Sequence, residues 1–160
     1  HAAGAGAAER AVSLNPERVE GHFWLGVNLA LFAESAAGLR AARALLKAVT
    51  SLERAAAVSP EYHDAGPYRV LGRLKHRAPW FLGGSRKTSR RYFDRALEIA
   101  PANSVTLIYA AELAADAGER DRAVSFLERI AAAPIDPLWE FENRRDHVLA
   151  QEMLARLTDV

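Results

Sequence analysis

Three arginines recur every four residues near the middle of the chain, and together they could bind an acid group. Arg69, Arg73 and Arg77 have the spacing of residues on one face of a helix, and His76 lies beside them. Guanidinium groups on one stripe suit a carboxylate, either of a peptide or of a small organic acid. An ordinary solvated face with ion pairs to neighbouring helices explains the same stripe equally well.

The stretch APWFLGGSRK, which follows these arginines, is a second candidate site. Its Trp-Phe pair is apolar for a loop, and its glycines and serine open the next helix with two basic residues in the first turn. Backbone amides there could hold an anion. The alternative is that the aromatic pair packs the loop over the core. The residues concerned are Trp80, Phe81, Gly83, Gly84, Ser85, Arg86 and Lys87.

The side chains of many catalytic and metal sites are missing from this sequence. It has no cysteine, which excludes disulfides, thiolate metal sites and cysteine nucleophiles. Its five histidines lack metal-binding spacing such as HExxH, and no GxSxG or comparable nucleophile motif occurs. We therefore expect a binding protein and no enzyme, without a metal or a cofactor.

Charge is unevenly distributed although the net charge is only +1. Residues 69–95 carry nine Lys or Arg against one Asp, a balance of +8, so the rest of the chain is acidic. The near-zero total and the acidic flanks argue against nucleic acid as the partner. No run of about 18 apolar residues occurs, so we expect no membrane span.

Helical patterns separated by glycine and proline predict the elements that position these residues. Asn15 and Pro16 are expected to be the N-cap and first residue of a long helix, and a partial helix precedes them. Further helix pairs predict an all-α solenoid of about three helix-turn-helix units, with a single domain over residues 1–160. The expected units are residues 16–59, 60–100 and 101–133, followed by a capping helix at 143–157.

Small residues at matching positions give these units a family resemblance. Leu25-Gly26 in the first unit and Leu71-Gly72 in the second, each with alanines late in the partner helix, resemble the tetratricopeptide repeat. In that family the first helix of each pair lines a concave groove. The resemblance implies that the arginine stripe lies in the groove, with further exposed contacts at Phe23, Val27 and Glu112.

Longer motifs narrow the resemblance. Three motifs resemble those of the T-component proteins of TRAP transporters, namely WLGVNLALFAES, APWFLGGS and a final DP…RRDHVLAQEML. This implies a non-enzymatic periplasmic adaptor, lipid-anchored in its precursor, that partners the substrate-binding subunit of an organic-acid transporter. The start at His1 rather than Met suggests a processed precursor or a shortened chain.

Two alternatives and one further expectation accompany this interpretation. The chain could be a module that binds an acidic peptide or an organic acid, or a cytoplasmic scaffold similar to the regulator-of-microtubule-dynamics family. The long Ala-rich hairpin at residues 16–58 carries more apolar surface than a short array covers, so we also expect a homo-oligomer.

Overall fold

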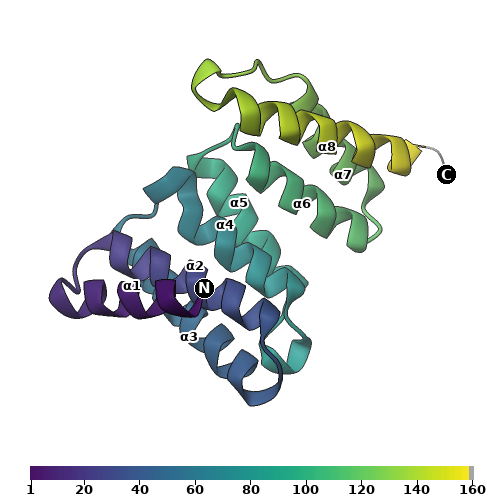
Figure 1. The fold of residues 1–160 in the computed structure, drawn as a ribbon. Helices are drawn as coiled ribbons and strands as arrows, with labels where there is room; N and C mark the ends of the chain where they lie inside the picture. Colours follow the sequence, from purple (N-terminus) through teal and green to yellow (C-terminus); the bar gives the residue numbers. More distant parts are fainter. Residues whose placement is uncertain (159–160) are drawn as a thin grey trace. The chain divides into compact units, whose positions relative to one another are not determined.

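The computed structural model describes residues 1–158, which fold into eight α-helices and two short 3-10 helices without a strand. The chain divides into two compact units, one of residues 1–99 and one that begins at residue 100. The prediction of an all-α fold with helix-turn-helix pairs is confirmed (Figure 1). The three repeat units and the single domain stay predictions.

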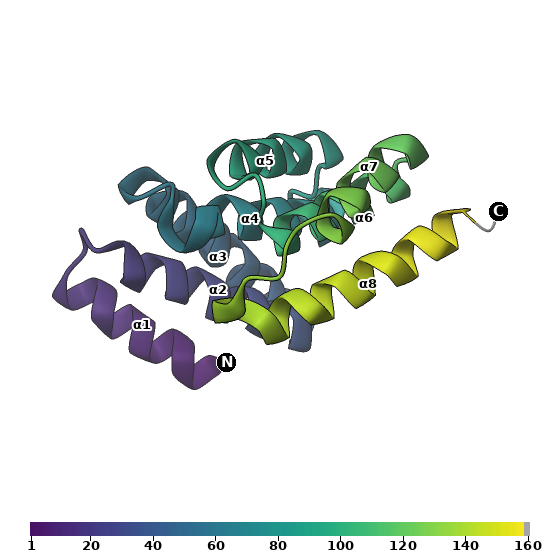
Figure 2. The same cartoon turned by 90° about the horizontal axis from the view of Figure 1, so that it is seen from above.

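Five α-helices and one 3-10 helix form the first unit. Each α-helix packs on the next one in the chain, and α2 also touches α4. Figure 2 shows α1 running alongside α2. A cluster of buried apolar side chains from α1 to α4 forms the core of this unit. The bounds are α1 (Ala2–Leu14), α2 (Val19–Ser35), α3 (Gly38–Val58), α4 (Tyr62–Arg77), η1 (Trp80–Leu82) and α5 (Arg86–Ile99).

Two glycines let paired helices of this unit approach closely. A Cβ atom added at Gly26 of α2 would lie 2.5 Å from Cγ of Leu52, and one at Gly72 of α4 would lie 2.5 Å from Cε1 of Phe93. The Ser89 hydroxyl also donates to the Gly72 carbonyl over 2.8 Å, which joins α5 to α4. The glycines of the two Leu-Gly pairs thus lie where a side chain is sterically excluded.

The second unit contains the helices α6 (Ser104–Asp116), α7 (Arg120–Ala131), η2 (Pro137–Trp139) and α8 (Glu140–Thr158). The α6 helix packs on α7 and α8, and α7 packs on α8. Asp146 of α8 is only 2% exposed and accepts hydrogen bonds from the Ser104 hydroxyl at 2.5 Å and from Nη2 of Arg145 at 2.8 Å. This carboxylate ties the start of α6 to α8.

The predicted N-cap at Asn15 is wrong. Asn15 ends α1, because its backbone N–H donates to the Ala11 carbonyl over 3.0 Å and completes the last turn of that helix. Pro16 then lies in a turn, and α2 begins only at Val19 after Arg18 in an extended conformation.

Candidate functional site

The arginine stripe lies on α4 as predicted, but its members have different surroundings. Arg69 and Arg73 are half-buried, as is His76, whereas Arg77 is exposed near the end of the helix. The Arg69 guanidinium donates to the backbone carbonyls of Asp64 at 3.0 Å and His63 at 3.2 Å. Arg69 therefore supports its own chain, and a shared ligand for all three arginines stays a prediction.

Arg69 holds an unusual turn at the start of α4. His63, Asp64 and Ala65 have φ values of 51°, 54° and 59°, so three consecutive residues other than glycine adopt the left-handed conformation. Each such residue costs roughly 1–2 kcal/mol, and the cost is smaller for Asp. The regular helix follows from Gly66, where an added Cβ would lie 2.9 Å from the Phe23 ring.

Aromatic rings surround this turn. Phe23 stacks on the His63 ring with a centroid distance of 5.4 Å, and Tyr62 meets both rings edge-on at 5.2 Å and 4.8 Å. Trp24 contacts Phe23 and His63 at 5.2 Å and 5.5 Å. Phe23 is only 4% exposed, so the expectation of an exposed side chain there is wrong. Packing against the turn that follows α3 buries this ring.

The loop after α4 presents its aromatic pair to solvent. Trp80 is 84% exposed and Phe81 is 67% exposed, and their rings meet edge-on with centroids 5.8 Å apart. The alternative that the pair packs over the core is therefore wrong. Leu82, the third apolar residue of η1, is half-buried instead.

Hydrogen bonds and glycines fix the shape of this loop. The backbone N–H groups of Gly83 and Gly84 donate to the carbonyls of Trp80 and Pro79, both at 3.0 Å. Gly83 has φ +85°, and a Cβ at Gly84 would lie 1.8 Å from the Ala78 carbonyl oxygen. The loop thus holds its two aromatic side chains outward in a defined conformation.

Ser85 caps the next helix as expected. Its hydroxyl accepts a hydrogen bond from the Thr88 N–H at 3.2 Å, and its carbonyl accepts one from the Ser89 N–H at 2.8 Å. Arg86 and Lys87 are exposed in the first turn. The N–H groups of Gly83, Gly84 and Ser85 already donate to backbone carbonyls, and that of Thr88 donates to the Ser85 hydroxyl. An anion would therefore have to use the N–H groups of Arg86 and Lys87, and an anion site stays a prediction.

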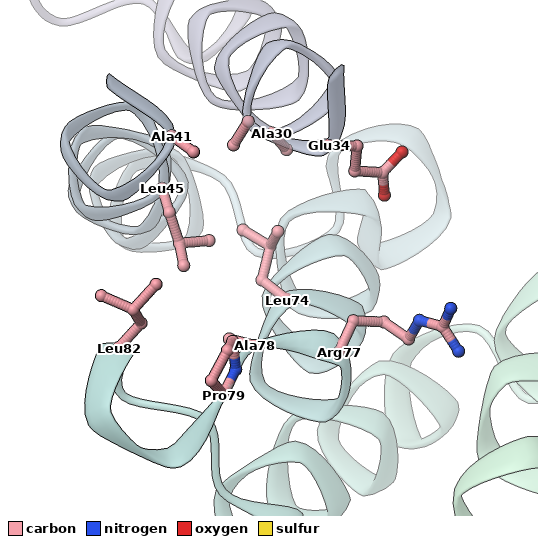
Figure 3. Close-up of a pocket in the computed structure, with 10 residues that line it drawn as sticks. Ala30, Glu34, Ala41, Leu45, Leu74, Arg77, Ala78, Pro79 and Leu82 are labelled. Carbon is pink, nitrogen blue, oxygen red and sulfur yellow. The ribbon is translucent and has the colours of Figure 1, made fainter. Parts of the chain in front are cut away.

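An apolar cavity of about 190 Å³ lies in the first unit, between the ends of α2 and α4, the start of α3, and η1. Figure 3 shows Leu45, Leu74 and Leu82 converging on it. Glu34 and Arg77 line its edge, and Arg77 is the only predicted site residue that it includes. The other lining residues are small, namely Ala30, Ala33, Ala41, Ala78 and Pro79.

The sequence contained only a weak signal for this cavity. Alanine is common in any packed helix, and only the pairing of the helices shows that Ala30, Ala33 and Ala41 face one space. Val27 is half-buried and packs against the core, and Glu112 lies half-buried on α6 in the second unit. A graded groove that joins these residues to the arginines stays a prediction.

The described residues contain neither a cluster of metal ligands nor a membrane-spanning helix. Within residues 1–158, no group of three or more His, Cys, Asp or Glu side chains could hold a metal ion. No helix in the same range is both long and apolar enough to cross a bilayer. Burial, with a smaller contribution from Glu53, raises the pKa of Tyr92 on α5, but Tyr92 lies outside the cavity.

Comparison with known proteins shows the family to which the chain belongs. A search of curated proteins finds no significant match. A family model described as TRAP transporter T-component matches residues 5–159, which is nearly the whole chain and includes the arginine stripe, the aromatic loop and the cavity. The chain therefore belongs to the TRAP transporter T-component family.

Proposed function

We propose that this T-component is a periplasmic adaptor that binds the substrate-binding subunit of its transporter through the loop after α4. The observation that carries the proposal is the exposure of Trp80 and Phe81 on a loop of fixed conformation. Aromatic side chains dominate the energy of many protein interfaces, and a preorganised loop loses little entropy on binding. The family assignment supports a protein partner within a transporter.

Charge around the loop favours an acidic partner surface. Arg86 and Lys87 are exposed directly after it, and residues 69–95 carry a balance of +8. Such a surface accelerates association with an acidic protein and makes the rate depend on salt. Neutralising the pair with Arg86→Gln and Lys87→Gln should therefore lower the association rate more than it raises the dissociation rate.

Binding of the purified chain to a substrate-binding subunit from the same organism tests the proposal. The double variant Trp80→Ala and Phe81→Ala should weaken binding at least tenfold in calorimetry, because it removes both aromatic contacts. A matched control is the double variant Trp139→Ala and Phe141→Ala, since these side chains are 58% and 76% exposed on the second unit. Equal affinity of the wild type and the loop variant would refute the role of the loop.

The location and the assembly of the protein belong to the same proposal and need their own measurements. Fractionation of cells that produce the full-length precursor should place the protein with the periplasmic or membrane-anchored material, and recovery in the cytoplasm would favour the scaffold alternative. Light scattering of the purified chain should give the mass of an oligomer, and a monomer at high concentration would contradict the expected self-association.

A further inference from the structure

The cavity in the first unit has the properties of a site for a small apolar ligand. Its walls are formed by three leucines and by residues too small to fill the space between them. Its volume of about 190 Å³ exceeds that of an engineered cavity of roughly 150 Å³ that accepts benzene, and lies below the roughly 300–1,000 Å³ of sites for drug-sized molecules. The size therefore fits a ligand with a short, branched or ring-shaped apolar part.

Two opposite charges at the edge define the polar part of the ligand. Glu34 of α2 and Arg77 of α4 are both exposed, and Figure 3 shows their charged ends extending on the same side of the apolar walls. Among the described residues, neither side chain forms an ion pair, with the other or with a third residue. Both groups are thus available to a ligand.

We propose that this cavity binds a free α-amino acid with an apolar side chain of about the size of leucine. The side chain lies among Leu45, Leu74 and Leu82, the carboxylate faces Arg77 and the ammonium group faces Glu34. This inference rests on the cavity and not on the proposed partner contact at the loop, so either can fail alone.

Simpler ligands fit the two charges less well. A monocarboxylate would be attracted by Arg77 but repelled by Glu34. An apolar amine, which is positively charged, would be attracted by Glu34 but repelled by Arg77. An uncharged apolar ligand would gain nothing from either group. Only a zwitterion complements both charges while its apolar part fills the cavity, and glycine, which has no side chain, would lose the apolar contribution.

Calorimetry with four ligands tests the proposal on the purified chain. L-Leucine should bind at least tenfold more tightly than 4-methylpentanoate, 3-methylbutylamine or glycine, which each lack one of its three groups. No measurable binding of leucine at millimolar concentration would overturn the proposal. Equal affinity for leucine and 4-methylpentanoate would overturn it as well, because the ammonium group would then have no partner.

Variants of Glu34 and Arg77 test which group of the ligand each residue binds. Glu34→Gln and Arg77→Gln should each lower the affinity for leucine about tenfold, and Glu34→Gln should leave 4-methylpentanoate binding equal or stronger. The charge-matched controls are Arg43→Gln and Glu128→Gln, which change exposed residues outside the cavity and should bind leucine as the wild type does. Wild-type affinity for leucine in both edge variants would refute the assignment.

Filling the cavity tests where the ligand lies. Ala33→Leu should abolish leucine binding, because the larger side chain occupies the space. If that variant does not fold, NMR of the wild-type chain answers the same question. Leucine should then shift the amide signals of Ala41, Leu45 and Ala78, and shifts confined to other parts of the chain would place the ligand elsewhere and overturn the proposal.

Discussion

The close approach of α4 and α5 at Gly72 predicts that one added methyl group will destabilise the protein. In Gly72→Ala, the new Cβ would lie 2.5 Å from Cε1 and 2.6 Å from Cδ1 of Phe93. That ring is 1% exposed, and the bond from Ser89 to the Gly72 carbonyl joins the two helices at the same point. Neither the ring nor the helix can move away without disturbing the core.

The expected change in the free energy of unfolding of Gly72→Ala is the difference between two opposing effects. Alanine in a helix interior is about 0.8–1.0 kcal/mol more favourable than glycine. Overpacking a core costs about 1–3 kcal/mol, and the upper end applies because the ring must move by roughly 1 Å to reach an ordinary contact distance. The free energy of unfolding of the first unit should therefore fall by about 1–2 kcal/mol.

Urea unfolding followed by circular dichroism measures this change, and hydrogen exchange assigns it to α4 and α5. With a denaturant slope of about 2 kcal/mol per molar, the midpoint should fall by roughly 0.5–1 M. Gly6→Ala on α1 is the matched control, since no atom lies within 4 Å of its added Cβ, and it should be neutral or stabilising. Phe93→Leu should partly rescue Gly72→Ala. A Gly72→Ala protein as stable as the wild type would refute the reasoning.

Three further predictions concern single side chains. Arg69→Lys should lower the free energy of unfolding by about 1 kcal/mol in denaturant melts, because an ammonium group cannot reproduce the forked contact with the carbonyls of the turn at residues 63–65; an unchanged midpoint would contradict it. Asp146→Ala should lower the free energy of unfolding by about 2–3 kcal/mol and speed hydrogen exchange in α6 and α8. The reason is that the nearly buried carboxylate is lost together with its hydrogen bonds to Ser104 and Arg145. Unchanged exchange in these helices would argue against this link. Burial raises the pKa of Tyr92, so the folded state holds the phenol proton more tightly and stability falls as the pH rises above about 10. Tyr92→Phe should therefore make the melting temperature less sensitive to alkaline pH. An unchanged slope of melting temperature against pH would exclude this contribution.

The helices and their close contacts could be predicted because they depend on short-range patterns. Glycine in the Leu-Gly pairs indicated where helices touch, and the structure shows an excluded side chain at both Gly26 and Gly72. The serine before α5 also indicated its cap, which Ser85 provides. The cap depends on residues that lie close together in the sequence. The close contacts follow from one steric rule, namely that glycine stands where two helices approach too closely for a side chain.

The left-handed turn and the cavity could not be predicted in this way. Nothing in the residue types of His63, Asp64 and Ala65 demands positive φ values, and packing of aromatic rings from α2 and the hydrogen bonds from Arg69 support them. The cavity likewise depends on three helices and a loop that meet only in the folded chain. The sequence left two directions open for Trp80, because an apolar loop residue can pack inward or face a partner, and only the structure shows that it faces solvent.

The segment Pro79–Leu82 has two sides, and this arrangement has a thermodynamic consequence. Pro79 and Leu82 form part of the cavity wall, whereas Trp80 and Phe81 between them face solvent. If the cavity and the aromatic pair both bind as proposed, a molecule that displaces the wall would also displace the aromatic pair and so change its affinity for a protein partner. Because coupling between two binding events is reciprocal, the partner would alter the occupancy of the cavity by the same factor. Under the two proposals, this short segment would thus couple the binding of a small molecule to the binding of a protein.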